Sequence, residues 1–290
     1  MLNSPCVGNC RVDDGTGLCV GCARSRQEIA AWSAATPEFR QKIWSELPER
    51  RRKLGLGLHR LDWDAAALRV FIIQSLWSGG TWTIGVPGAI AEFGLGADEA
   101  RTIETRNDTI SVASSRGAIS FATGDFVRSF AFGATDRETI VLALPSRRAM
   151  PVAGPGLVRV GADHQAIQAA DCEKILYDFG LGRRGVSFGV RTDDAALLTL
   201  LDGSVGQDWR QFLPLIGDDL RRASPTRVVR NSIGRIEVYA EIPPAGGVSP
   251  EGPHTHFLPE FLTESRETPI GIDLSEAYVA CAIYYPPPVD

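Results

Sequence analysis

Four of the six cysteines in this chain lie close together near its N-terminus, in the stretch "CVGNCRVDDGTGLCVGC". They follow the pattern C-x3-C-x8-C-x2-C and are Cys6, Cys10, Cys19 and Cys22. Four thiolates, each about 2.3 Å from a zinc ion, complete the closed tetrahedron of a structural zinc site. Four cysteines also serve as the ligands of iron–sulfur clusters. The spacing therefore predicts one metal centre and leaves open whether it holds Zn²⁺ or an iron–sulfur cluster.

The residues between and after these cysteines suit such a centre. Gly21 precedes the last cysteine, where a residue without a side chain permits a tight turn that aims both sulfurs at one point. The segment "DDGTG" supplies the chain reversal that brings the first pair of cysteines back to the second. Basic side chains that can offset the negative charge of the thiolates follow closely: Arg11, Arg24 and Arg26.

A second group of candidate residues lies in "SPEGPHTHFLPEFL", which contains His254 and His256. In an extended segment, residues two apart point to the same side, so both imidazoles can face one ion or one substrate. Glu260 follows, giving His-x-His-x3-Glu. Three interpretations stay open: a loop ordered by the histidines with Pro259 starting a helix, a substrate or anion site, and a metal site.

Arg191 is the remaining candidate for a binding residue, at the end of a predicted strand in "FGVRTDD". A guanidinium group there can hold a carboxylate or phosphate by two parallel hydrogen bonds, or it can pair with the neighbouring Asp193. If it anchors a substrate, His254 or His256 can act as the acid or base of an enzyme. No recognisable catalytic motif accompanies these residues.

The elements that must position the cysteine site can be predicted from helix-start signals. Ser25 and Glu28 form a capping box, and Thr36 followed by Pro37 predicts a second helix start. Two short helices behind the cysteines make a helical module over residues 1–53. Its core is small, and a bound metal would supply the missing stability.

We expect a linker over residues 54–62 and an α+β domain of unknown function over 63–290, either as one body or as two halves, 63–150 and 165–290. A helix is predicted over Trp63–Trp77 and another, interrupted near Pro214, over 208–223. Short β-strand patterns separated by Gly, Asn and Asp turns occupy most of the remainder. Hairpins are predicted in "TISVASSRGAISFAT" and from "TRVVRNS" to "GRIEVYAEIP", and the turn "GRR" is predicted between the strands "KILYDFGL" and "GVSFGVRT". Strands that follow strands favour a mostly antiparallel sheet.

Composition and charge indicate in which cellular compartment the protein resides and which classes of partner it can bind. The first 60 residues carry ten Lys and Arg against six Asp and Glu, whereas the rest is acidic, and the net charge is −5. An acidic body makes nucleic acid an improbable partner for the whole protein. We found no secretory signal and no membrane span, and therefore expect a cytoplasmic protein whose thiols stay reduced. The isolated Cys172 and Cys281 are then expected to be buried apolar residues.

The first 52 or so residues resemble a family of small bacterial proteins, domain of unknown function 1289, often labelled predicted iron–sulfur proteins. The shared features are Ser-Pro-Cys, three further cysteines, a Gly-Cys pair, a Glu-Ile…Trp helix and a closing Leu-Pro-x-Arg. This resemblance implies that the same four cysteines bind metal. The rest of the chain resembles an uncharacterised bacterial domain through "GAIAEF", "FGVRTDD", "GRIEVY" and "SPEGPHTHFLP".

The sequence thus predicts a metal-binding protein with an accessory, regulatory or partner-binding role, whose protein or small-molecule partner is not identified. The alternatives are an enzyme with a small-molecule site near "GPHTH" and an iron–sulfur redox protein.

Overall fold

Short strands with alternating buried and exposed residues form two antiparallel sheets in the computed structural model. The structure describes residues 4–96, 98–133, 138–149, 154–181, 185–244, 251–262, 268 and 272–287. On strand β2 (Thr81–Val86), Trp82 and Ile84 belong to the main core, whereas Thr83 points to the opposite face. Because successive side chains alternate, each sheet has an apolar face, and these two faces pack against each other. The predicted α+β class with mostly antiparallel strands is confirmed.

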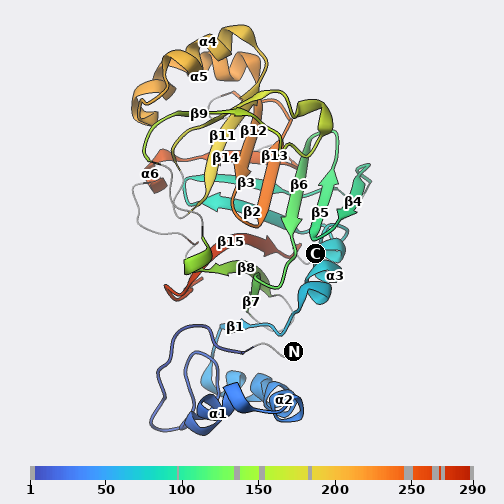
Figure 1. Ribbon diagram of the computed structural model, residues 1–290, viewed down its shortest axis with the longest axis vertical. Coiled ribbons are helices and arrows are strands. Elements are labelled where there is room, and N and C mark those ends of the chain that lie inside the picture. The colour runs from blue at the N-terminus through green and yellow to red at the C-terminus, as the bar shows by residue number, and fades with distance from the viewer. Residues whose placement is uncertain are drawn as a thin grey trace.

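The first sheet has seven strands. Their spatial order is β1 (Leu58–Arg60), β7 (Arg128–Phe132), β8 (Thr139–Pro145), β15 (Tyr278–Tyr285), β2, β3 (Ala89–Phe93) and β14 (His254–Phe257). The C-terminal strand β15 thus lies in the middle of the sheet, between two strands from the first half of the chain (Figure 1). Strand β14, at the edge, comes from the segment that contains the two histidines.

The second sheet has eight strands. Their order is β4 (Thr102–Arg106), β5 (Thr109–Ala113), β6 (Gly117–Ala122), β13 (Gly234–Val238), β12 (Thr226–Arg230), β11 (Ser187–Thr192), β10 (Ile175–Asp178) and β9 (Val158–Ala162). The predicted hairpins β5–β6 and β12–β13 are present. The predicted turn "GRR" between β10 and β11 lies outside the described residues. Each sheet combines strands from the first and second halves of the body.

The core between the sheets is centred on aromatic and branched side chains. Trp82 is fully buried, and its ring centroid lies 4.6 Å from that of Phe121 on β6. Its Nε1 donates a 2.8 Å hydrogen bond to Oγ of Ser75, the last residue of helix α3 (Ala65–Ser75). This bond satisfies the indole group inside the core and fixes α3 against the sandwich.

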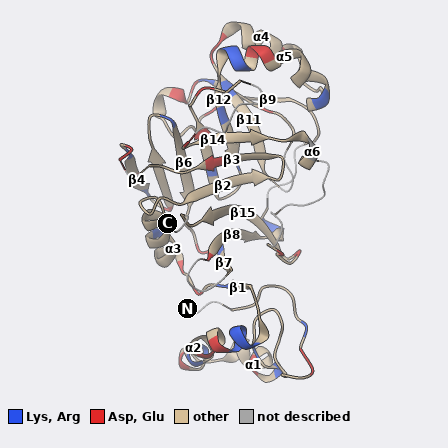
Figure 2. Cartoon of the chain, turned by 180° about the vertical axis from the view of Figure 1, so that it is seen from behind, with Lys and Arg blue, Asp and Glu red and all other residues tan. Residues whose placement is uncertain are grey.

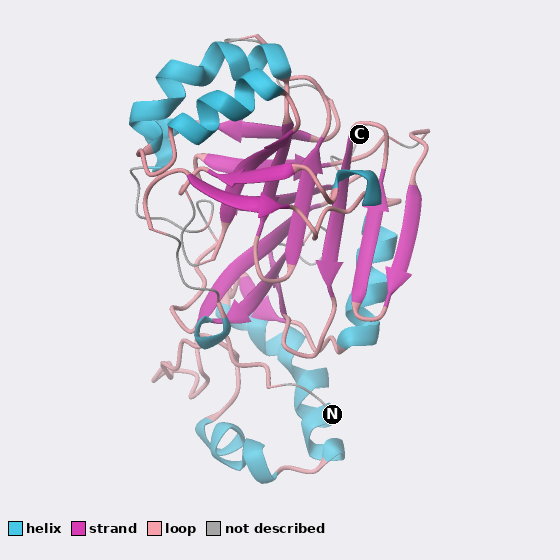
Figure 3. Ribbon diagram, turned by 45° about the horizontal axis from the view of Figure 1, so that its top comes forward, coloured by secondary structure: helices cyan, strands magenta, loops and turns pink. Residues whose placement is uncertain are grey.

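Helices α4 (Ala195–Gly203) and α5 (Trp209–Ala223) lie together at one end of the sandwich (Figure 3). The predicted interruption at Pro214 is wrong, because α5 is one helix with Pro214 inside it. A capping box of Asp208 and Gln211 satisfies the donors at its start. Helix α6 (Pro259–Leu262) begins at Pro259 as predicted. The sandwich domain also contains, among its described residues, the 3₁₀ turns η2 (Ser146–Arg148) and η3 (Ala169–Asp171).

The N-terminal helical module contains α1 (Arg26–Ala31), the 3₁₀ helix η1 (Trp32–Ala34) and α2 (Pro37–Leu54). The predicted capping box of Ser25 and Glu28 is present, and the Thr36 side chain caps α2. Its own buried cluster is small and consists of Ala23, Ile43 and Leu47. Within the segment predicted as a linker, β1 pairs with β7. The chain is thus a two-domain α+β protein in which the module adjoins one end of the sandwich (Figure 1).

Charged residues of both signs lie on α2 and on α5 (Figure 2). None of the helices described combines the length and the apolar character that crossing a lipid bilayer requires.

Candidate functional site

The second pair of cysteines lies in a tight loop that presses against the first. The Cys19 N–H donates to the carbonyl of Arg24 over 2.8 Å, and the Ala23 N–H donates to the carbonyl of Cys19 over 2.7 Å. Ala23 adopts a left-handed conformation with φ of 59°. A Cβ at Gly21 would clash with the carbonyl oxygen of Asn9, so glycine is required where the two loops meet. This local geometry agrees with the tight turn predicted from the sequence.

The first cysteine is attached to the sandwich rather than to the helices. The Tyr278 hydroxyl on β15 donates to the carbonyl of Cys6 over 3.4 Å. The next residue, Val7, is buried in a cluster with Ile272 and other apolar residues on the outer face of the seven-stranded sheet. The Gly8 N–H donates to the Cys6 sulfur over 3.3 Å. The four cysteines therefore lie on segments that contact two different parts of the molecule. The segment of Cys6 contacts the seven-stranded sheet, and the segment of Cys19 and Cys22 contacts the helical module.

Neighbouring cysteines lie close enough to influence the protonation of Cys10 and Cys22. The charge of Cys6 is the largest cause of a raised pKa at Cys10, followed by burial. Burial raises the pKa of Cys22 although the nearby Arg24 opposes this effect. Without a bound metal the thiols of Cys10 and Cys22 therefore resist ionisation, and metal binding has to displace their protons.

Three buried arginines surround the cysteines with donors that have no acceptor among the described residues. The Arg24 Nε donates to the Cys22 sulfur over 3.4 Å, but its Nη1 has no acceptor. Arg51 on α2 leaves Nε and Nη2 unpaired, and Arg60 on β1 leaves Nε unpaired. Burial lowers the pKa of Arg51 to about 10, and a negative charge on Cys22 opposes this shift. Burial likewise lowers the pKa of Arg60, with a charge on Cys6 among the opposing influences.

Such unpaired buried donors are costly unless a negative group compensates them. The donor set around the cysteines therefore fits a metal–thiolate centre that carries negative charge.

The two histidines meet a carboxylate on the neighbouring strand. The Nε2 atoms of His254 and His256 are 2.8 Å apart, and each lies 3.7 Å from a different carboxylate oxygen of Glu92 on β3. Among the described residues, this is the one group of three or more His, Cys, Asp or Glu side chains whose ligand atoms all lie within 4.8 Å of one another. The cysteine sulfurs are spaced more widely. The side chain of Glu260 lies outside the described residues.

Arg191 does not join the histidines. It is buried on β11 and pairs with Asp163 and Asp171 at 2.8 Å and with Glu237 at 2.7 Å. Its neighbours Val190 and Phe188 are in the main core, so Arg191 lies on the outer face of the eight-stranded sheet. The histidines lie on the outer face of the other sheet, because the intervening Thr255 pairs with core residue Ala91. The alternative pairing with Asp193 is also wrong.

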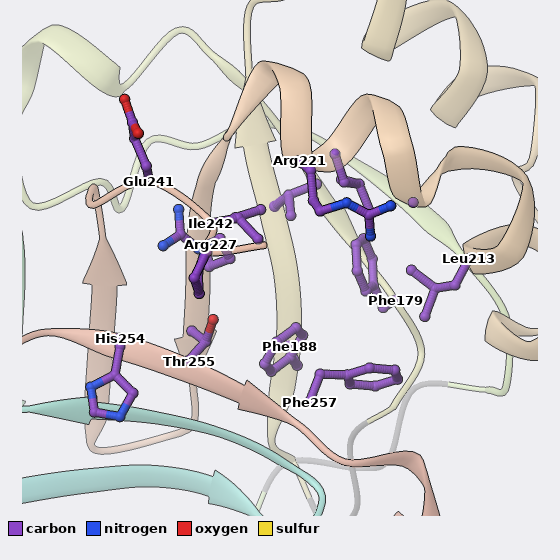
Figure 4. A pocket seen from close by; sticks show the side chains of 14 residues that line it. Phe179, Phe188, Leu213, Arg221, Arg227, Glu241, Ile242, His254, Thr255 and Phe257 are labelled. Carbon is purple, nitrogen blue, oxygen red and sulfur yellow. The ribbon is translucent and has the colours of Figure 1, made fainter. Parts of the chain in front are cut away.

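A cavity of about 370 Å³ lies next to the histidine strand, between α5 and the two sheets. Phe179, Phe188 and Phe257 gather on one side of it, with Leu213 of α5 close by (Figure 4). Arg227 of β12 lines the same cavity and is 5% exposed. Burial alone lowers the pKa of Arg227 to about 10.

Arg227 has no ion-pair partner among the described residues of this cavity. Its Nη1 donates to the carbonyl of Pro225 over 3.0 Å, and its Nε has no acceptor. The carboxylate of Glu241, which also lines the cavity, points away from the guanidinium group (Figure 4). The cavity therefore presents apolar walls and one uncompensated cation.

Comparison with known proteins assigns the two candidate sites to different family models. Residues 74–289 match the model of a family of unknown function, DUF6925, and this match covers most of the chain. The chain belongs to the DUF6925 family. Residues 4–51 match a second model, the protein of unknown function DUF1289, which confirms the N-terminal resemblance. Neither a curated protein nor a solved structure matches the chain. The cysteines thus lie in the DUF1289 match, and the histidine cluster and cavity lie in the DUF6925 domain.

Three functional candidates were missed from sequence. In the DUF6925 domain, Glu92 is the one charged residue of "GAIAEF" and Arg227 interrupts the apolar pattern of "TRVVR". A charge next to apolar strand residues was the available signal in both cases. Arg51 belongs to the basic run "RRRK", which is typical of a solvated helix end, but its side chain is buried, with 8% exposure. Of the two isolated cysteines, Cys281 is buried as expected, whereas Cys172 is only half-buried.

Proposed function

We propose that Cys6, Cys10, Cys19 and Cys22 bind one metal centre, and that this centre fastens the helical module to the sandwich. The observation that carries the proposal is the set of buried, unpaired donors of Arg24, Arg51 and Arg60 around the thiols. A divalent ion with four thiolates carries a net charge of about −2, which would compensate these cations. Its role is then accessory or regulatory, in a cytoplasm that keeps the thiols reduced.

The proposed centre links two anchors that have few other connections. Cys6 is attached through Val7 and Tyr278 to the seven-stranded sheet. Cys22 precedes Ala23, which packs against Ile43 and Leu47 of α2. A metal bound by both Cys6 and Cys22 would connect the module to the seven-stranded sheet. It would thereby stabilise a module whose own buried cluster is small. Binding free energy of a structural metal is then folding free energy of the module.

A zinc ion and an iron–sulfur cluster would require different separations of the four sulfurs. A zinc tetrahedron with bonds of about 2.3 Å places all of its sulfurs about 3.8 Å apart, whereas no three of these cysteine sulfurs all lie within 4.8 Å of one another. Zinc would therefore draw the two loops together, whereas an iron–sulfur core would hold the thiolates farther apart. Anaerobic purification distinguishes the two: acid-labile sulfide and visible absorbance identify a cluster, and a colourless protein with one zinc per chain identifies zinc.

The proposal is tested by Cys19→Ser, with Cys172→Ser as the matched control outside the cluster. We expect Cys19→Ser to lose the metal and to lose amide hydrogen-exchange protection in α2, while β2 and β3 stay protected. Cys172→Ser should keep both. Full metal content in the Cys19→Ser protein would rule out the four-cysteine centre.

A second candidate function is favoured by the unpaired Arg227. We propose that the cavity beside β14 binds an apolar carboxylate, with the acid group on Arg227 and the chain among the phenylalanines. Its volume falls in the usual range of ligand sites, and a small number of polar groups typically orient the ligand in such sites. This proposal keeps a small-molecule site near "GPHTH" but assigns its anchor to Arg227 instead of Arg191.

Calorimetric titration with decanoate tests this site, with decanol as a neutral ligand of the same length. Decanoate should bind more tightly than decanol in the natural protein and lose that advantage in Arg227→Met. Arg221→Met, which changes an exposed arginine at the rim, should preserve it. Equal binding of the acid and the alcohol would refute the role of Arg227.

A further inference from the structure

We propose that Glu92, His254 and His256 form a second metal site, which binds a divalent first-row transition ion such as Zn²⁺ or Fe²⁺. Two imidazole nitrogens and one carboxylate are a ligand set that proteins use for catalytic zinc and for non-haem iron. The site is separate from the cysteine centre and belongs to the other domain of the chain.

The ligand atoms already have nearly the separation that an ion requires. Bonds of about 2.1 Å at angles between 90° and 110° would place neighbouring ligand atoms about 3.0–3.4 Å apart. The observed separations are 2.8 Å between the two Nε2 atoms and 3.7 Å from each Nε2 to Glu92. Small rotations of the side chains would bring all three atoms onto one ion.

A hydrogen bond to the backbone places the proton of the His254 ring on the nitrogen that faces away from the proposed metal. Its Nδ1 lies 2.7 Å from the carbonyl oxygen of Gly252, and a carbonyl oxygen only accepts hydrogen bonds. Nδ1 therefore carries the proton, and in the neutral ring Nε2 has a free lone pair directed toward His256 and Glu92. A backbone carbonyl that orients the second nitrogen of a histidine is the usual support of a histidine metal ligand.

Paired strands hold the three side chains in place. In the antiparallel ladder His254 lies directly opposite Glu92, and His256 lies opposite Ile90, so the three ligands share one face. This face is the outer one, and the side chains of His254, His256 and Glu92 remain 14%, 27% and 29% exposed. An ion held there is reached directly from solvent.

The surroundings leave room for further ligands of the ion. Glu92 lines a cavity of about 230 Å³ together with Thr83, Ile90 and Tyr285. Thr83 lies opposite Glu92 on β2, is 9% exposed, and its Oγ1 has no hydrogen-bond partner among the described residues. Three protein ligands and an adjoining cavity are typical of an open metal site, where water or substrate completes the coordination.

The experiment is a Co²⁺ titration of the full-length protein as purified, with its cysteine centre in place. Cobalt at the histidine site should give ligand-field absorption without the thiolate-to-cobalt charge-transfer bands that mark cysteine ligation. Added Zn²⁺ should displace it. We expect one such cobalt per chain, in addition to any metal at the cysteines.

Two variants assign the site, and each has a control. His256→Ala and the isosteric Glu92→Gln should each weaken this binding by at least about a hundredfold, because loss of an outer-shell partner alone costs about 10–100-fold. His164→Ala and Glu104→Gln change exposed residues and should leave it unchanged. Circular dichroism checks that Glu92→Gln remains folded.

The proposal is overturned if the natural protein shows no cobalt absorption beyond the thiolate bands, because the histidines then simply share a hydrogen bond. It is also overturned if folded Glu92→Gln binds cobalt as tightly as the natural protein. Retention of the histidine signal in Cys19→Ser would show that the two metal sites are independent.

Discussion

Arg24 donates a hydrogen bond from Nε to the sulfur of Cys22 over 3.4 Å, while the centroid of the Trp32 ring lies 4.6 Å from its guanidinium carbon. The guanidinium group is thus held between the cysteine loop and the helical module. Hydrogen bonds from a charged donor are stronger when the acceptor is a thiolate rather than a neutral thiol. Arg24 is 3% exposed, so little solvent screens this contact.

Arg51 should affect the cysteine centre although, among the described residues, it makes no hydrogen bond to a sulfur. We expect Arg51→Leu to weaken metal binding at the cysteines by about 10–100-fold, the range for residues that support metal ligands. The adjacent Arg52→Leu is the control, because the Arg52 side chain is 71% exposed and pairs with Glu49 at the surface. Competition with a chromophoric chelator measures both affinities. Equal affinities would show that Arg51 is not part of the centre's environment.

The capping box at the start of α1 should contribute measurably to the stability of the module. Ser25 accepts a 3.2 Å hydrogen bond from the Glu28 N–H, and Glu28 accepts one of 2.8 Å from the Ser25 N–H. Ser25→Ala should lower the free energy of unfolding of the module by about 1 kcal/mol. Hydrogen exchange of α1 and α2 amides reports this change. Ser33→Ala, at an exposed position of η1, should have a much smaller effect.

The buried network around Glu237 should make the stability of the sandwich sensitive to acid. Burial raises the pKa of Glu237, but the hydrogen bond from Arg191 and the charges of Arg235 and Arg191 outweigh it, so the net pKa lies below its usual 4.5. A lowered pKa in the folded state stabilises the protein above pH 4.5, and this contribution disappears as the pH falls through the folded-state pKa.

Glu237→Gln tests this network. It should cost about 3–5 kcal/mol at neutral pH, because Arg191 and Arg235 lose a buried counter-charge. Its unfolding free energy should also depend less on pH below 4.5 than that of the natural protein. Urea denaturation at several pH values measures both effects, with Glu104→Gln on the exposed strand β4 as the control. An unchanged pH dependence would contradict the assigned role of Glu237.

Arg227 should destabilise the ligand-free protein. A buried cation without a counter-charge is unfavourable, so Arg227→Met should raise the free energy of unfolding by about 1–3 kcal/mol. Arg106→Met, at a position whose side chain is 82% exposed, should change it little. Thermal denaturation without ligand makes the comparison. A loss of stability in Arg227→Met would mean that the arginine is compensated within the protein.

The sequence by itself determined the features that depend on neighbouring residues. The capping box of Ser25 and Glu28, the start of α2 at Pro37 and the hairpin of β5 and β6 all appear where predicted. Their hydrogen bonds join groups only a few residues apart, so the residue types at those positions are sufficient. The same holds for the loop that brings Cys19 and Cys22 together. Local reasoning failed at Pro214, where α5 tolerates a proline.

The tertiary structure decided which side chains meet across the sheets. Arg191 pairs with Asp163, Asp171 and Glu237 instead of its neighbour Asp193, because an outward-facing residue on a strand meets residues of other strands. Strand register likewise brings Glu92 opposite His254 and directs Arg227 inward. Register depends on the pairing and packing of all the strands together, so no short segment of the sequence contains it.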